Sequence, residues 1–217
     1  MPEDLAHRAD VTDQPEAPPS RPVRPRHAAS IVVLRTEGDE PSMLMGMRGA
    51  KHRFMPNRLV FPGGAVEHTD LAAPSATQLP PHTERLLRKA ADEHLARGIA
   101  VAAARELHEE TGLSLGTPPR LDALEYLCRA ITPPNSPIRF NARFLLVPEE
   151  VVSGTLGGDG ELENLRFYGV REALALDLAA PTRLVIERAQ LWITMDDMTR
   201  RARTEAPVLR NQSWRME

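Results

Sequence analysis

The sequence predicts an α+β fold in which helices cover a mixed β-sheet. Short runs of apolar, β-branched residues indicate strands, and longer segments with apolar residues at helical spacing indicate helices. Glycine- and proline-rich turns separate the two kinds of segment. A length of 217 residues suits one well-buried domain, and no internal repeat divides the chain. We therefore expect one domain over residues 27–200.

The two ends of the chain are predicted to lie outside this domain. Residues 1–26 hold six prolines and several arginines but almost no large apolar side chains. Such a composition cannot bury enough surface to offset the entropy lost on ordering, so a disordered tail is expected. Residues 201–217 are expected to form a C-terminal tail.

The domain is predicted to begin with a hairpin and a glycine turn. Its strands are Ile31–Leu34 and Met43–Met47, two short apolar runs joined by a polar turn. A third strand, Leu59–Phe61, runs directly into Gly63 and Gly64. Paired glycines permit backbone angles that other residues resist, so the chain should turn sharply there.

Two helices are predicted to follow this turn. Thr83 can cap the first, Gly98 is expected to end it, and its core-facing residues are Leu86, Leu87, Ala90 and Leu95. The second, about Ile99 to Thr111, stops at Gly112, because glycine best adopts the left-handed conformation after a helix end.

Three strands and one helix complete the predicted domain. The strands are Leu121–Ala130, Arg139–Val147 and Leu165–Val170. Pro181 is suited to the first turn of the last helix, which offers the core Leu184, Val185, Ala189 and Leu191.

Composition narrows the classes of partner. A net charge of -3 gives no basic footprint for a nucleic acid polymer, and no apolar run approaches the roughly 18 residues that cross a bilayer. The single Cys128 rules out an intrachain disulfide framework. We therefore expect a cytoplasmic protein that binds neither nucleic acid nor membrane.

Three carboxylates crowd one face of the second helix. Glu106, Glu109 and Glu110 stand at i, i+3 and i+4, where like charges repel, and they lie near the helix C-terminus, which also disfavours anions. A hard divalent cation such as Mg²⁺ or Mn²⁺ would remove this repulsion by taking oxygen ligands. A solvated acidic face is the alternative interpretation.

The nine residues Arg105-Glu106-Leu107-His108-Glu109-Glu110-Thr111-Gly112-Leu113 resemble the second half of the Nudix box, with every fixed position matched. The first half of that box is similar to the segment from Gly64 to Asp70, where Asp70 replaces the usual glutamate. The 34 residues of Leu71–Ala104 far exceed the usual separation of the two halves. An insertion at about 71–98 therefore interrupts the box, and its amphipathic helix is expected to lie beside the metal site and to influence substrate choice.

The resemblance implies a Nudix-type α/β/α sandwich and gives roles to the matched residues. Arg105 would pair with Asp70 and orient the helix. One of the glutamates is available as a base. The expected ligands of Mg²⁺ or Mn²⁺ are Glu106, Glu109, Glu110 and Gly64, and the structural positions of the box are Gly63, Gly64, Asp70 and Gly112. Glu161 and Glu163 are candidates for an extra carboxylate, with plain solvated loop charges as the alternative.

Two further segments resemble part of the coenzyme A diphosphatase branch. They are Leu44-Met45-Gly46-Met47-Arg48 with Phe61-Pro62-Gly63-Gly64, and Ile131-Thr132-Pro133-Pro134 with the strand after it. The candidate contacts to substrate phosphates are Arg48, Arg53, Arg139 and Arg143. The alternative is that these cations only meet solvent; strand alternation puts Arg139 and Arg143 on one face.

The expected activity is metal-dependent hydrolysis of a pyrophosphate bond in a nucleoside diphosphate linked to another moiety. Coenzyme A or acyl-CoA is the first candidate, and ADP-ribose, NADH or a nucleotide sugar comes next. The expected partner is thus a small-molecule pyrophosphate, and the resemblance makes a homodimer plausible. A non-catalytic Nudix-like regulatory module that only binds a ligand is the alternative from another class.

Overall fold

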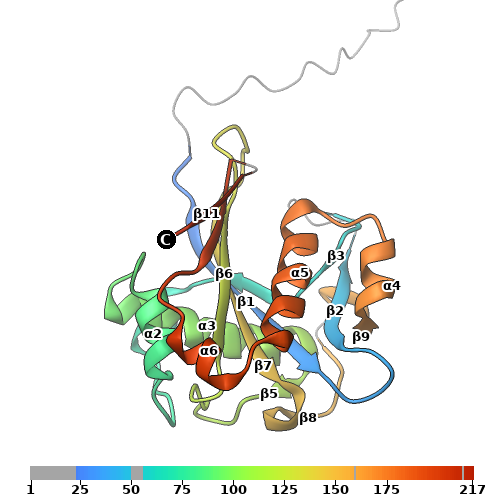
Figure 1. Cartoon of the computed structure of the whole chain (residues 1–217), viewed down its shortest axis with the longest axis horizontal. Coiled ribbons are helices and arrows are strands. Elements are labelled where there is room, and N and C mark those ends of the chain that lie inside the picture. Colours follow the sequence, from blue (N-terminus) through green and yellow to red (C-terminus); the bar gives the residue numbers. More distant parts are fainter. Residues whose placement is uncertain (1–22, 50–55, 159, 212) are drawn as a thin grey trace, which may run out of the picture.

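A nine-stranded mixed sheet forms the centre of the computed structural model, which describes residues 23–49, 56–158, 160–211 and 213–217 (Figure 1). Its main strand order is β11-β10-β6-β7-β1-β2-β3, with β4 paired to β1 and β9 paired to β2. The strands are β1 (Arg26–Arg35), β2 (Ser42–Arg48), β3 (Leu59–Val60), β4 (Gly63–Ala65), β6 (Glu125–Ile131), β7 (Phe140–Pro148), β9 (Leu162–Gly169), β10 (Pro207–Arg210) and β11 (Ser213–Met216).

Helices cover both faces of this sheet. They are α1 (His68–Ala72), α2 (Pro81–Leu87), α3 (Glu93–Thr111), α4 (Val170–Ala175), α5 (Ala180–Thr194) and α6 (Asp197–Ala202). Smaller elements are the two-stranded sheet of β5 (Leu113–Ser114) and β8 (Ser153–Gly154) and the 3-10 turn η1 (Glu149–Val151). The predicted α+β class and the sandwich around a mixed sheet are therefore confirmed.

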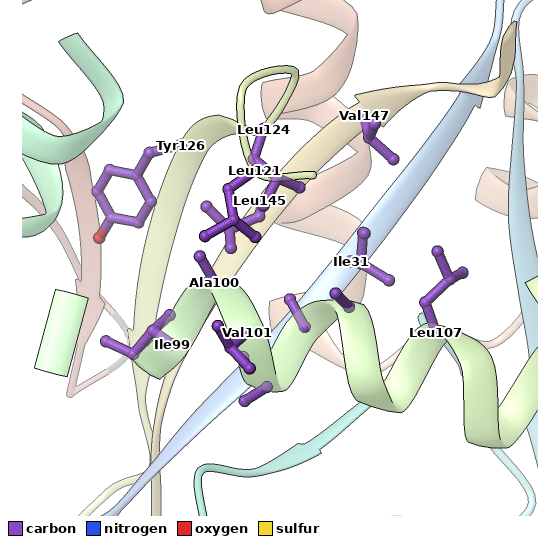
Figure 2. Packing of buried hydrophobic residues seen from close by; sticks show 14 of the residues in the cluster. Ile31, Ile99, Ala100, Val101, Leu107, Leu121, Leu124, Tyr126, Leu145 and Val147 are labelled. Carbon is purple, nitrogen blue, oxygen red and sulfur yellow. The ribbon is translucent and has the colours of Figure 1, made fainter. Parts of the chain in front are cut away.

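The central strand β1 shows why both faces need a helix layer. Residues Ile31–Val33 are all fully buried, because β1 lies between β7, to which it is parallel, and β2, to which it is antiparallel. Alternate side chains point to opposite faces and enter two separate apolar clusters. Figure 2 shows the cluster under α3, where Ile99, Leu107 and their neighbours meet Ile31 and Leu145.

The carboxylate helix α3 begins earlier than predicted. Asp92 caps it by accepting a hydrogen bond from the Leu95 N–H at 2.8 Å. Gly98 lies inside α3 rather than ending a preceding helix, so that prediction was wrong. A Cβ at Gly98 would lie 2.5 Å from Leu71 Cδ2, and the glycine therefore serves the close packing of α1 on α3.

The insertion at 71–98 belongs to the core under α3. Leu79, Leu86 and Leu87 of this segment join that cluster, and the Thr83 hydroxyl donates to the Leu124 carbonyl at 2.9 Å. Thr83 lies within α2 and does not cap it, because Pro81 already starts the helix. In Figure 1, α2 lies beside α6 and α3, whereas α5 lies towards β2 and β3.

The C-terminal segment is part of the sheet. Residues expected to form a tail at 201–217 instead supply the end of α6 and the strands β10 and β11, with β10 parallel to β6. Val208 and Leu209 are buried there, a pattern too short to recognise in the sequence. The predicted last helix, α5, also differs from expectation. Leu191 was expected in the core but is 48% exposed, and Trp192 is buried there instead. No helix of the described residues is long and apolar enough to cross a membrane.

Candidate active site

The glycine turn and the carboxylate helix meet, although the sequence separates them by the insertion. The Gly63 N–H donates to Glu110 Oε2 at 2.8 Å. A Cβ at Gly64 would lie 2.2 Å from Glu106 Oε1, so only glycine lets this carboxylate lie against the turn. Pairing of β4 with β1 opposes Gly64 to Ala29 and fixes the turn on the sheet. The two halves of the interrupted box thus form one site.

Arg105 joins the carboxylates at this site. Its Nε and Nη2 donate to the two oxygens of Asp70 at 2.9 and 3.1 Å, as the resemblance implies. Its Nη1 donates to Glu106 Oε1 at 2.9 Å and to Glu109 Oε2 at 2.8 Å. Burial alone would lower the pKa of Arg105, but the Asp70 hydrogen bonds and the charges of Glu106 and Asp70 outweigh it and raise that pKa.

Asp70 can replace the usual glutamate because α1 brings its carboxylate to Arg105. Asp70 is buried near the start of α1, where its Oδ2 also accepts from the Glu67 N–H at 2.7 Å. This reciprocal contact is a capping box, which fixes the side chain at the helix N-terminus. The shorter acid therefore keeps a bidentate pair with the arginine of the box.

Replacement of Asp70 by asparagine is expected to lower the free energy of unfolding by about 1–3 kcal/mol, because one buried acceptor of a charged donor is lost. Chemical unfolding of the metal-free protein measures this change. Asp197→Asn is the matched control, since Asp197 pairs with Arg201 at two-thirds exposure and should change stability by less than about 1 kcal/mol. Equal effects of both variants would remove the structural role assigned to Asp70.

Burial disfavours the ionised form of two of the carboxylates. Glu110 is only 2% exposed, and burial raises its pKa to about 8 against the opposing Gly63 hydrogen bond, with added repulsion from Glu161 and Glu106. Burial also raises the pKa of Glu106, which Arg105 opposes. A nearby cation would lower the pKa values of both carboxylates and favour their ionised forms. Their oxygen atoms suit a hard divalent cation.

The third carboxylate stands apart from these two. Glu109 is half-exposed and lies against Arg105. Among the described residues, no three His, Cys, Asp or Glu side chains are arranged to hold a metal ion. Arg105 explains part of this arrangement, because its hydrogen bonds turn Glu106 and Glu109 towards the guanidinium. Arg105 donates to Oε1 of Glu106 and to Oε2 of Glu109, so each carboxylate can keep this bond and offer its other oxygen to a cation.

A cavity of about 650 Å³ starts at the glycine turn. Its described lining includes Gly63, Gly64 and Arg48, whose charge acts on Glu110. Arg48 Nε is buried and has no hydrogen-bond partner in the described structure, so the hydrogen bonding of this guanidinium is incomplete. The rest of the lining is mainly apolar, with Phe61, Phe140, Phe144, Ile131, Leu184 and Leu209 as its largest members.

Not all predicted contacts join this cavity. Arg139 donates to the Thr132 carbonyl at 3.0 Å and does not line it. Arg53 lies outside the described residues. Glu163 is exposed on β9, whereas the charge of Glu161 acts on both Glu106 and Glu110. Of the two extra carboxylate candidates, Glu161 is therefore the one near the site.

Arg143 contradicts both sequence-based interpretations, because it meets neither solvent nor the cavity. It is 1% exposed and faces the α3 side of the sheet, where it donates to the Ala90 carbonyl at 2.8 Å and the Asn141 carbonyl at 3.0 Å. Burial lowers the pKa of its guanidinium to about 10. The expected solvent-facing side of the strand is instead covered at Arg143 by Ala90 of the insertion.

Most of the cavity wall was not predicted from the sequence. Ala28, Ala142 and Ala130 are opposed across β1, β7 and β6 and form part of its lining. Alternation along β7 places Phe140 and Phe144 on the same face as Ala142, a signal that the sequence did contain. The contribution of Thr182 from α5 depends on tertiary packing and had no such signal.

Comparisons with known proteins show a likeness in sequence and in fold. No family model matches the chain. The chain is 36% identical over 88 residues to nudix hydrolase 7 of Caenorhabditis elegans; the match covers 41% of this chain and only 22% of that protein.

Similar solved structures cover most of the chain. A NUDIX hydrolase from Alicyclobacillus acidocaldarius has 24% identity and a TM-score of 0.61, and the match covers 76% of this chain and 90% of that one. The NUDIX domain of Shewanella oneidensis NrtR, solved with ADP ribose, has 14% identity and a TM-score of 0.52 over 79% and 90% of the two chains. These likenesses establish the fold. The chain therefore has a Nudix-type fold, and the residues that join at its interrupted box resemble those of a Nudix hydrolase.

Proposed function

We propose that this protein hydrolyses a pyrophosphate bond in a nucleoside diphosphate linked to another moiety. The observation that carries the proposal is the convergence of Glu106 and Glu110 on the glycine turn, which opens into a cavity with one partnerless arginine donor. Carboxylates that repel one another are destabilising for the fold, and such local conflicts are expected at functional sites.

The donor set fits Mg²⁺ or Mn²⁺. Glu106, Glu109 and Glu110, with the backbone at Gly64 nearby, would hold the cation, and Glu161 would add a further negative charge. When bound, such a cation neutralises phosphate charge and lowers the pKa of water. The raised pKa values of Glu106 and Glu110 support this fit, because a cation beside them would favour their ionised forms.

Residues of this site carry out proton transfer, positioning and phosphate binding. Water attacks one phosphorus atom, the bridging P–O bond breaks, and two phosphate-containing products leave. One of the box glutamates accepts the proton of the water, and Arg105 positions Glu106 and Glu109 through its shared Nη1. Arg48 can donate to a substrate phosphate from the cavity side.

The cavity favours coenzyme A or an acyl-CoA among the candidate substrates. Its described lining offers hydroxyls from Ser30, Thr132 and Thr182 and otherwise little polar surface. The many hydroxyls of a nucleotide sugar would therefore lack partners, at a cost of about 1–3 kcal/mol for each one buried. ADP-ribose and NADH are the second candidates, and ADP ribose is the ligand in the similar NrtR structure.

A panel of pyrophosphates tests this proposal. We expect the purified protein with Mg²⁺ or Mn²⁺ to release two phosphate-containing products from coenzyme A or its thioesters faster than from ADP-ribose, NADH or a nucleotide sugar. Removal of the metal by a chelator should abolish turnover. Binding of the panel without any turnover, at several metal concentrations, would favour the alternative of a non-catalytic module.

A further inference from the structure

Arg143 is a buried cation that forms no hydrogen bond with a carboxylate of the described residues. It is 1% exposed, and its guanidinium donates to the Ala90 carbonyl at 2.8 Å, the Asn141 carbonyl at 3.0 Å and His27 Nδ1 at 2.8 Å. Arg129, directly opposite on β6, carries the same charge. A buried charge depends on its hydrogen bonds, so the contact with His27 helps to stabilise Arg143 inside the fold.

This contact fixes the protonation state of His27. An arginine nitrogen can only donate a hydrogen bond, so the Nδ1 atom of His27 must accept with its lone pair. A proton on Nδ1 would set two N–H donors against each other and would place a second positive charge beside the guanidinium. The contact therefore exists only with the neutral imidazole.

The charges around the imidazole mainly oppose its protonation. The charged groups that act on His27 or on its partner come from five elements: Arg24 before β1, Asp92 at the cap of α3, Arg129 on β6, Arg143 on β7 and Glu217 after β11. Partial burial lowers the pKa of His27, the three arginines lower it further, and Asp92 acts in the opposite direction. Glu217 forms an ion pair with Arg129.

His27 lies at the end of the strand that holds the glycine turn. Its carbonyl accepts from the Val66 N–H at 2.9 Å, next to the pairing of Ala28 with β4. Arg143 in turn ties β7 to the Ala90 carbonyl, in the connection between α2 and α3. The contact between the two side chains therefore joins the start of β1 to β7 and to the insertion.

We infer that His27 and Arg143 form an acid-sensitive latch at the start of β1. While His27 is neutral, the latch is closed. Protonation removes an acceptor from the buried guanidinium and sets two cations against each other, so the imidazole leaves Arg143 and the hydrogen bond from Val66 opens. The glycine turn then loses one of its attachments to the sheet. This inference concerns the fold and does not depend on the proposed hydrolysis.

The direction of the pH effect follows from the lowered pKa of His27. The unfolded chain binds this proton more readily than the folded protein does. The stability that the latch contributes is therefore complete above the usual pKa of about 6.5 and is lost as the pH falls below it.

Urea unfolding at about pH 7.5 and pH 5.0 tests the latch. We expect the unfolding constant of the wild type to rise, relative to that of His27→Asn, at least about threefold on acidification. The asparagine oxygen can accept from Arg143 and takes up no proton in this range. His94→Asn, an exposed change on α3, is the matched control and should respond to acid as the wild type does. Titration of Glu106 and Glu110 affects all three proteins alike.

Amide exchange locates the effect. After correction for the intrinsic exchange rate at each pH, protection of the Val66 N–H should fall at least about threefold at pH 5.0 in the wild type and in His94→Asn. It should stay constant in His27→Asn. The Val170 N–H, which donates to the Pro41 carbonyl, is the internal reference and should keep its protection in all three proteins.

Two results would overturn the inference. They are an equal loss of stability towards acid in the wild type and His27→Asn, and Val66 protection that does not change with pH in the wild type. If His27→Asn does not fold, an NMR titration of His27 in the wild type decides instead. A pKa at or above about 6.5 would then contradict the latch, whereas a lower pKa at which Val66 loses its protection would support it.

Discussion

Replacement of Glu110 by glutamine is expected to lower turnover at least about a hundredfold under saturating Mg²⁺. The amide oxygen can still accept the Gly63 N–H, so the turn at β4 should keep its place. What is lost is a buried negative charge that would face a cation. Glu109→Gln should have a similar effect on turnover, because it removes another charge from the same helix face.

Stability distinguishes this loss of activity from a loss of fold. Burial raises the pKa of Glu110 to about 8, which means that its ionised form is disfavoured in the folded, metal-free protein. The glutamine variant should therefore be as stable as the wild type, or more stable, at pH 8 without metal. Glu187→Gln, an exposed change on α5, serves as the control for turnover. Wild-type turnover in both Glu109→Gln and Glu110→Gln would contradict the assignment.

The end of the carboxylate helix could be predicted because its signals are local. Gly112 adopts φ +72° and its N–H bonds the His108 carbonyl, so the glycine ends α3 as its position predicts. The hairpin was equally accessible: β1 and β2 pair with Leu34 opposite Met43. In both cases the determining residues are neighbours in sequence, and tertiary packing only reinforces their preferences.

Features that depend on contacts between residues far apart in the sequence could not be predicted from local sequence patterns. A single glycine within a helical pattern only weakly disfavours the helix. Gly98 remains part of α3, where Leu71 packs closely against it. The two short strands at the C-terminus depend on the free edge of β6, which no local pattern reveals. Likewise, Arg143 is buried because Ala90 of the insertion covers it and accepts its hydrogen bond.

The candidate site was also predictable only in part. The carboxylates and Arg105 were recognisable from their spacing, and the contact between Arg105 and Asp70 follows from the resemblance. The cavity wall was not recognisable, because it combines three strands and the start of α5. The residues of the proposed chemistry therefore lie mainly in one short segment, whereas the residues that line the cavity are brought together only by the fold.

Replacement of Leu71–Arg97 by a short linker is expected to abolish folding. The sequence alone favoured a separable element that would change substrate choice, but the segment does not line the described part of the cavity. Instead, it supplies Leu79, Leu86, Leu87 and Ala96 to the core under α3 and includes the Asp92 cap of that helix. Loss of several buried leucines, at about 2–5 kcal/mol for each, exceeds the usual total stability of a domain this size.

Point variants make this prediction quantitative. Leu87→Ala should lower the free energy of unfolding by about 2–5 kcal/mol, because Leu87 is 2% exposed and its removal leaves a cavity between α2 and the sheet. Leu191→Ala removes the same atoms at 48% exposure and should cost about 1 kcal/mol or less. Urea unfolding measures both. If Leu87→Ala were no more costly than Leu191→Ala, and the linker variant unfolded cooperatively near the wild-type midpoint, the insertion would be an appendage and the core under α3 would be complete without it.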